Sequence, residues 1–190
     1  MKVLVTGGAR SGKSNFAERL CMKLAPAAVY IATAQAFDDE MRTRIELHQH
    51  QRTEAGYLWE TIEEPEKLAQ VLATIGEEHI RKQMEAPAIL IDCLTLWLSN
   101  QLLRLEGRAD QEEQLNLVIQ QLLESIRQYP GLLIMVTNEV GDGVVPSYPL
   151  GRLYRDLAGR LNQRAASQCD QVFLVTAGIP IELKSREYKL

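Results

Sequence analysis

Eight residues near the start of the chain have the types and spacing of a phosphate-binding loop. The pattern G-x-x-x-x-G-K-[ST] is matched in full by Gly7, Gly8, Ala9, Arg10, Ser11, Gly12, Lys13 and Ser14. Glycines let successive backbone N–H groups in such a loop converge on phosphate oxygens. Lys13 would meet the β- and γ-phosphates, and the hydroxyl of Ser14 would bind Mg²⁺. The stretch therefore predicts a site for a nucleoside triphosphate.

The residues on either side predict a strand before this loop and a helix after it. Val3–Val5 is apolar, and Phe16, Ala17 and Leu20 recur at helical spacing. A helix that begins near Lys13 would direct its N-terminal N–H groups at the same anion. A glycine-rich turn that matches by chance is the alternative, and the strand and helix beside it argue against that interpretation.

Other polar residues follow apolar runs that are typical of buried strands. Asp92 and Thr33 each follow such a run, as do Asn138 and Glu139 further along the chain. Because ligands gather at the carboxyl ends of parallel strands, we expect these residues near the glycine loop, with Asp92 as a partner of Mg²⁺. The alternative is that Asp92 caps the helix that begins at Leu94.

His48 is a candidate nucleophile on a predicted helix. Met41, Ile45 and His48 recur at i, i+4 and i+7, which places the imidazole on the apolar face. A neutral imidazole can hold a phosphoryl group as a phosphoramidate, and Arg44 and Arg52 would flank that group with positive charge. The alternative is a core or capping histidine whose neighbouring arginines are solvated.

Strands and helices alternate along the chain. Strands are predicted at 2–6, 28–32, 88–92, 132–137 and 171–176, with an extended piece at 57–61 and an edge strand at 179–184. Helices are predicted at 13–25, 38–52, 94–105 and 110–128, and another begins at Pro65 and ends near Gly76 or continues to Gln83. A final helix carries Leu150, Leu153, Leu157 and Leu161. This alternation predicts one α/β domain over residues 1–190, with a mostly parallel sheet and helices on both faces.

Composition argues against several classes of partner. The net charge is −4, from 25 acidic and 21 basic residues, and no extended basic run offers a footprint for nucleic acid. No apolar stretch approaches the roughly 18 residues of a membrane span, and the N-terminal apolar run is too short for a signal peptide, so we expect a cytoplasmic protein. Cys21, Cys93 and Cys169 are widely spaced and predict reduced core thiols rather than a disulfide or zinc site, with catalytic use as the weaker alternative.

Further motifs give the chain a specific resemblance. Together with the glycine loop, it resembles the bifunctional adenosylcobinamide kinase / adenosylcobinamide-phosphate guanylyltransferase family from end to end. The motifs that carry this resemblance are Tyr30-Ile-Ala-Thr33, Asp38-Asp-Glu-Met41, Arg44-Ile45 with His48 and Arg52, Trp59-x-Thr61-x-Glu63, Asp92-Cys-Leu-Thr95, Val136-Thr-Asn-Glu-Val-Gly141 and Gly159-Arg-x-Asn-Gln163.

The resemblance implies a RecA-like P-loop NTPase that carries out two successive reactions. ATP or GTP, with Mg²⁺, would phosphorylate adenosylcobinamide, and GTP would then transfer GMP through His48 to the new phosphate, giving adenosylcobinamide-GDP in cobalamin biosynthesis. It also implies a homotrimer. Lys13 and His48 would be the catalytic residues, and Ser14 and Asp92 would bind the metal. The implied nucleotide contacts are the glycine loop together with Ala32, Thr33, Ala34, Gln49, His50, Gln51, Arg52, Glu63 and Asp92.

Two other classes of function remain open from the residues alone. A monofunctional P-loop kinase of a small metabolite would need only the glycine loop and Asp92, with His48 structural. A regulatory module that binds nucleotide without turnover would need only the loop. A covalent adduct of the protein with GMP would separate the bifunctional enzyme from both.

Overall fold

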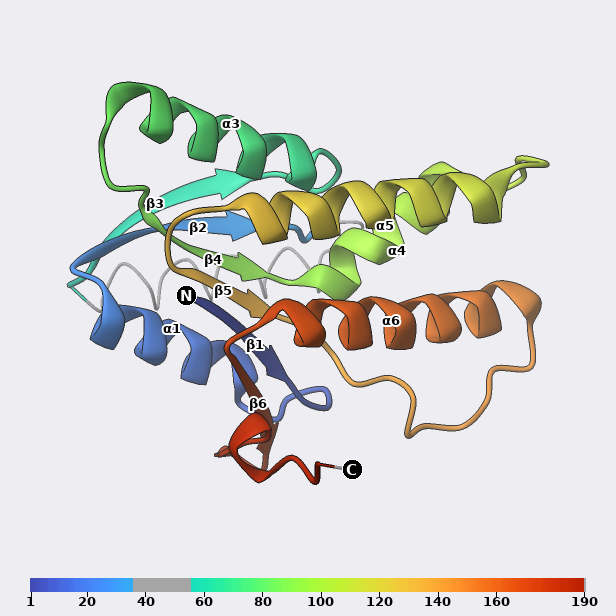
Figure 1. Ribbon diagram of the computed structural model, residues 1–190. Coiled ribbons are helices and arrows are strands. Elements are labelled where there is room, and N and C mark those ends of the chain that lie inside the picture. Colours follow the sequence, from blue (N-terminus) through green and yellow to red (C-terminus); the bar gives the residue numbers. More distant parts are fainter. Residues whose placement is uncertain (36–55, 190) are drawn as a thin grey trace.

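The computed structural model describes residues 1–35 and 56–189 and contains a seven-stranded sheet (Figure 1). Its order is β3-β2-β4-β5-β1-β6-β7, and every neighbouring pair is parallel except β6 and β7. The strands are β1 (Lys2–Thr6), β2 (Ala27–Ala32), β3 (Leu58–Glu63), β4 (Ala88–Asp92), β5 (Leu133–Val136), β6 (Gln171–Thr176) and β7 (Ile179–Glu182). The predicted α/β fold with a mostly parallel sheet is confirmed.

Helices cover both faces of this sheet, as the sequence predicts. They are α1 (Lys13–Leu24), α3 (Leu68–Lys82), α4 (Leu94–Arg104), α5 (Gln111–Gln128) and α6 (Pro149–Gln168), followed by a 3₁₀ turn, η1 (Lys184–Arg186). In Figure 1, α1 lies on one side of the strands, and α3, α4, α5 and α6 lie on the other. The helix predicted at 38–52 lies outside the described residues.

Alternation along the strands produces two hydrophobic cores. In β1, Leu4 packs with the α3–α6 side of the sheet, whereas Val3 and Val5 pack with the α1 side. Both faces of the central strands are therefore buried, which explains why their sequences are apolar runs without polar alternation. All three cysteines are buried free thiols, so the predicted core role is confirmed.

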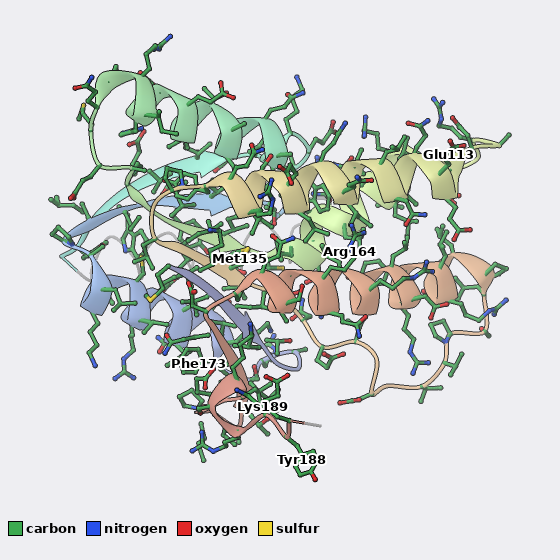
Figure 2. The ribbon with its side chains drawn as sticks, viewed as in Figure 1. Glu113, Met135, Arg164, Phe173, Tyr188 and Lys189 are labelled. Carbon is green, nitrogen blue, oxygen red and sulfur yellow. The ribbon has the colours of Figure 1, made fainter. Side chains whose placement is uncertain are left out.

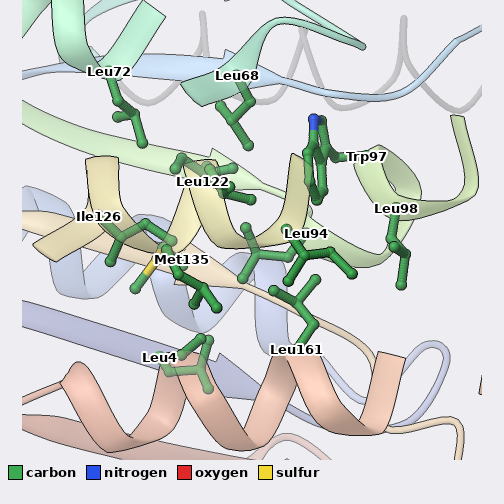
Figure 3. Close-up of a cluster of buried hydrophobic side chains, with 14 of the residues drawn as sticks. Leu4, Leu68, Leu72, Leu94, Trp97, Leu98, Leu122, Ile126, Met135 and Leu161 are labelled. Atoms are coloured by element: carbon green, nitrogen blue, oxygen red, sulfur yellow. The ribbon is translucent and has the colours of Figure 1, made fainter. Parts of the chain in front are cut away.

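The larger core lies between the sheet and α3, α4, α5 and α6 (Figure 3). Trp97 is almost fully buried there, and its indole nitrogen donates a hydrogen bond of 3.0 Å to the carbonyl of Glu66. The predicted apolar stripe of α5 faces this core through Leu115, Ile119, Leu122, Leu123 and Ile126. Figure 3 shows Leu122 and Ile126 pointing from α5 toward the strands.

Two predicted extended segments are corrected in extent. The piece predicted at 57–61 is a full strand, β3 (Leu58–Glu63), because it pairs with β2 along its whole length. The predicted edge strand at 179–184 is shorter, ends at Glu182 and runs antiparallel to β6. No helix in the described ranges 1–35 and 56–189 is long and apolar enough to cross a membrane.

The position of β5 determines how far apart β1 and β4 lie in the sheet. β5 pairs with β1 on one side and with β4 on the other. Neighbouring strands lie about 4.8 Å apart, so the strands that end in the glycine loop and in Asp92 are about 10 Å apart. Both strand ends therefore lie at one edge of the sheet, on either side of β5.

Leu122→Ala should lower the free energy of unfolding by roughly 2–5 kcal/mol, because a fully buried side chain is replaced by a cavity. Leu117→Ala on the same helix is the matched control, since Leu117 is 45% exposed and the change should cost less than about 0.5 kcal/mol. Urea unfolding followed by circular dichroism measures both. Equal losses would contradict the assignment of the buried face of α5.

Candidate functional site

The glycine loop connects β1 to α1 and is held closely against β6 and its turn. A Cβ atom on Gly7 would lie 2.4 Å from the carbonyl oxygen of Val175, so no larger residue fits there. Gly12 has left-handed dihedral angles (φ 91°, ψ 6°) at the N-cap of α1, which glycine adopts without strain. The N–H of Gly178 donates to the carbonyl of Ser11 at 2.9 Å. The loop shape predicted from the glycines is therefore confirmed.

Lys13 lies at the first position of α1 with its side chain folded back over the loop. Its ammonium group donates to the carbonyl oxygen of Gly8 at 3.0 Å, and the residue is 8% exposed. A buried ammonium group needs an anion or several acceptors close to it. The charge is thus already located where the loop would hold a phosphate group.

Two buried hydroxyl groups at the loop indicate whether the loop could bind a phosphate group. Thr6 Oγ1 and Ser11 Oγ have no hydrogen-bond partner within residues 1–35 and 56–189. Such atoms are uncommon in folded proteins, and a ligand is one way to satisfy them. A Cβ atom on Gly8 would meet nothing within 4 Å, so the loop has open space on that side. These features fit a phosphate ligand.

Asp92 stands at the carboxyl end of β4, on the same edge of the sheet as the glycine loop. The hydroxyl of Tyr30 donates to Asp92 Oδ2 at 3.1 Å. In the part of the chain that the structure describes, no group of three or more His, Cys, Asp and Glu side chains gathers around one point. A Mg²⁺ ion here would therefore take most of its ligands from phosphate and water, as Mg²⁺ commonly does, with Asp92 and Ser14 from the protein.

The strand register brings several predicted site residues into one row. Ala32 of β2 pairs with Glu63 of β3 on one side and with Asp92 of β4 on the other. Asp92 in turn pairs with Val136 of β5. Glu63 is exposed at the end of this row, and Ala34 follows Ala32 along the chain. The predicted residues of this edge are thus neighbours, whereas His48, Gln49, His50, Gln51 and Arg52 lie outside the described residues.

Thr33 is fully buried and every one of its polar groups has a partner in the protein. Its hydroxyl donates to the carbonyl of Cys93 at 2.7 Å and accepts from the N–H of Cys93 at 2.8 Å. Its N–H donates to the carbonyl of Asp92, and its carbonyl accepts from Asn100 Nδ2. These bonds join the ends of β2 and β4. A direct nucleotide contact by Thr33 stays a prediction.

A network of side chains that sequence reasoning only partly identified joins the ends of β4 and β5 to α6. Asn138 Nδ2 donates to Thr95 Oγ1 at 2.8 Å, Thr137 Oγ1 donates to Asn162 Oδ1 at 2.6 Å, and Asn162 Nδ2 donates to the carbonyl of Asn138 at 3.0 Å. The hydroxyl of Tyr154 donates to the carbonyl of Thr95. Thr95, Thr137, Asn138 and Asn162 all belong to motifs singled out in the sequence, whereas Tyr154 lies outside those motifs.

Cys93 does not support the alternative of a catalytic cysteine. Burial, and after it the neighbouring carboxylate of Asp92, raise the pKa of its thiol to about 11. The group therefore stays protonated near neutral pH, and a protonated thiol is a poor nucleophile.

The Thr33→Val variant removes the hydroxyl that hydrogen-bonds the N–H and carbonyl groups of Cys93. We expect this change to lower the free energy of unfolding by about 1–3 kcal/mol, while Thr33→Ser, which keeps the hydroxyl, should restore most of the loss. Thermal unfolding and GTP binding would be measured on both variants. Weakened GTP binding by Thr33→Val at unchanged stability would instead support the predicted nucleotide contact.

Comparison with known proteins identifies close relatives over nearly the full length. Residues 3–183 match the family described as "Cobinamide kinase / cobinamide phosphate guanyltransferase". The chain is similar to "Bifunctional adenosylcobalamin biosynthesis protein CobP" of Pseudomonas aeruginosa, with 45% identity over 97% of this chain and 98% of that protein. It is 38% and 40% identical to proteins named "Bifunctional adenosylcobalamin biosynthesis protein CobU" in Escherichia coli and Salmonella typhimurium, covering 97% of this chain and 100% of each relative.

A solved structure shares the fold at low sequence identity. It is described as the assembled ATPase EscN of the enteropathogenic Escherichia coli type III secretion system, and it matches with a TM-score of 0.57 and 17% identity. The match covers 93% of this chain and 43% of that chain. The likeness shows that the two chains share a fold.

Proposed function

Because the chain belongs to the cobinamide kinase / cobinamide phosphate guanyltransferase family, we propose that it carries out both reactions of that name. In the first, the hydroxyl oxygen of adenosylcobinamide attacks the γ-phosphorus of ATP or GTP, and the nucleoside diphosphate leaves. In the second, GMP passes from GTP to the new phosphate, pyrophosphate leaves, and adenosylcobinamide-GDP forms. The two activities expected from the sequence motifs, kinase and guanylyltransferase, are the two activities in the family's description.

The single observation that carries this proposal is the glycine loop with Lys13 over it. The loop offers backbone N–H groups, the ammonium group of Lys13 hydrogen-bonded to the carbonyl of Gly8, and the hydroxyls of Thr6 and Ser11, which have no partner among residues 1–35 and 56–189. These donors suit the charge that develops on a transferring phosphoryl group. They support use of a nucleoside triphosphate and do not by themselves distinguish ATP from GTP.

Mg²⁺ and its ligands are part of the proposal. The metal would neutralise charge on the β- and γ-phosphates, with Ser14 and Asp92 as its protein ligands. Support comes from the position of both residues at one edge of the sheet, with β5 between their strands. A homotrimer, a cytoplasmic location and a single domain over residues 1–190 stay predictions.

We assign the guanylyl carrier to His48. Its imidazole nitrogen would attack the α-phosphorus of GTP with loss of pyrophosphate, and a phosphate oxygen of the acceptor would then displace the imidazole. The assignment rests on the spacing Arg44-Ile45-x-x-His48, because His48 lies outside the described residues.

His48→Ala should abolish a covalent adduct with GMP and the transfer of GMP, while phosphorylation of adenosylcobinamide stays measurable. The physical reason is that an N–P bond to imidazole needs the imidazole, whereas phosphoryl transfer needs the glycine loop. Incubation with α-³²P-GTP and Mg²⁺, denaturation, and treatment with acid and base measure the adduct. A phosphoramidate should be lost in acid and survive base.

Two other histidines provide matched controls for the adduct. His79→Ala should keep it, because Nδ1 of His79 lies 2.7 Å from the carbonyl of Ile75 on α3, away from the carboxyl edge of the sheet. His50→Ala should also keep a covalent label, since on a helix it is rotated about 200° from His48. Label that persists in His48→Ala would overturn the assignment, and absence of any adduct in the unmodified protein would favour a monofunctional kinase.

Asp92→Asn should shift the Mg²⁺ dependence of GTP turnover to concentrations at least about tenfold higher, because a metal ligand loses its charge. The unfolding temperature should change little, since the amide oxygen still accepts from Tyr30. Tyr30→Phe is the control that removes this hydrogen bond and keeps the carboxylate. If Asp92→Asn leaves the Mg²⁺ titration unchanged and lowers stability, Asp92 is a structural cap.

A further inference from the structure

A second positively charged site lies beside the glycine loop, on the outer face of α6. A groove of about 840 Å³ is lined there by Arg152, Arg155, Gly159 and Arg160 of α6 and by Gly141 of the preceding loop. Arg152, Arg155 and Gly159 recur at three- to four-residue intervals, and Arg160 lies eight residues after Arg152, so these residues share one face. Gly141, Gly159 and Arg160 belong to motifs that carry the family resemblance, but no role was assigned to any residue of this groove.

The charge of this groove is opposite to that of the whole protein. Three arginines and one acid, Asp156, line it, while the chain carries a net charge of −4. Arg152 donates to the carbonyls of Pro146 and Ser147, and Arg155 donates to the carbonyl of Gly141. Arg160 makes no hydrogen bond or ion pair with any residue in 1–35 or 56–189. A groove with this lining selects an anion.

Gly159 is an independent sign that a ligand approaches α6. It lies in the interior of a 20-residue helix, where glycine is less favourable than alanine by roughly 0.5–1 kcal/mol. A Cβ atom added there would meet nothing within 4 Å, so neighbouring protein atoms do not explain the glycine. Gly159 is exposed and lines the groove, so a ligand in the groove can approach the helix backbone there.

The loop beside the groove exposes apolar side chains. Val144 is 96% exposed, Val145 is 59% exposed and lines the groove, and Tyr148 is 61% exposed. Neighbouring exposed apolar residues of this kind mark a contact surface. The site thus offers an apolar surface next to guanidinium groups, which suits a ligand with a large, partly apolar body and an anionic group.

The groove is joined to the glycine loop through a short segment of backbone. The N–H of Glu139 donates to the carbonyl of Gly7 at 3.0 Å, and Glu139 Oε1 accepts from the N–H of Gly141, which lines the groove. Two residues of chain span at most about 7 Å. An anion in the groove therefore lies near a triphosphate in the glycine loop.

We propose that this groove binds the phosphate group of the phosphorylated corrinoid acceptor, and that Val144 and Val145 contact its macrocycle. The proposal rests on the proposed function, in which the second reaction brings together two phosphate-bearing substrates. The glycine loop binds the nucleotide, and the arginines of α6 bind the phosphate of the acceptor. Arg160 supplies the guanidinium group with no other described partner.

The test is equilibrium dialysis of adenosylcobinamide phosphate and adenosylcobinamide against the full-length protein without nucleotide, followed by the corrinoid's visible absorbance. The unmodified protein should bind the phosphorylated form more tightly. Arg160→Gln should weaken its binding at least about tenfold and change binding of adenosylcobinamide or GTP less than about twofold. Gly159→Leu should also weaken binding of the phosphorylated form, by filling the groove, while the unfolding temperature stays the same or rises.

Arg164→Gln is the matched control, because Arg164 is an exposed arginine of the same helix that does not line the groove (Figure 2). It should bind all three ligands as the unmodified protein does. The inference is overturned if Arg160→Gln and Gly159→Leu bind adenosylcobinamide phosphate normally, or if Arg160→Gln weakens GTP binding instead. Failure of the proposed function would give a different result. A protein that binds the phosphorylated corrinoid more tightly but catalyses neither reaction would refute the proposed function and still support the groove as the binding site of that corrinoid.

Discussion

Parallel pairing of β4, β5 and β1 is the constraint on which the site depends. It places the carboxyl ends of these strands at one edge, so the glycine loop, Asp92 and the loop after β5 face the same volume. Register extends this alignment to Glu63 and Ala32. None of these residues is close to the others in sequence, and the sheet alone makes them neighbours. Any change that shifts the register of a central strand would separate them.

Hydrogen bonds between strand ends then fix the edge. Thr33 joins β2 to the residue after β4, and Asn138 and Asn162 join the end of β5 to α6. Each of these groups is buried or half-buried and has its partner, so the network is rigid and costs little desolvation. The donors of the glycine loop are different, because two hydroxyls there lack partners in the described chain. The hydrogen bonds at the strand ends are therefore satisfied within the protein, whereas two hydroxyls of the glycine loop remain available to a ligand.

Much of this arrangement could be predicted from local patterns in the sequence. Apolar runs predicted the central strands, and the glycine motif predicted the loop, in which the structure gives Gly12 a left-handed conformation. The order of the strands could not be predicted, because it depends on pairings between distant segments, as between β1 and β6. The role of Thr33 was also hidden, since a threonine after a strand has the same sequence signal whether it bonds a ligand or Cys93. The groove on α6 combines a loop glycine with helix residues more than ten positions later, and no local pattern expresses that combination.

The bond between Ser11 and Gly178 ties the first functional residues to almost the last regular part of the chain. Gly7 likewise packs against Val175, and β1 pairs with β6. Contacts between segments so far apart in sequence form slowly, because a long loop must close before they can form. During synthesis from the N-terminus, the glycine loop emerges early but lacks these supports until β6 and its turn have left the ribosome. The phosphate-binding loop therefore gains its supporting contacts only after Gly178 has been made, more than 160 residues after the loop itself.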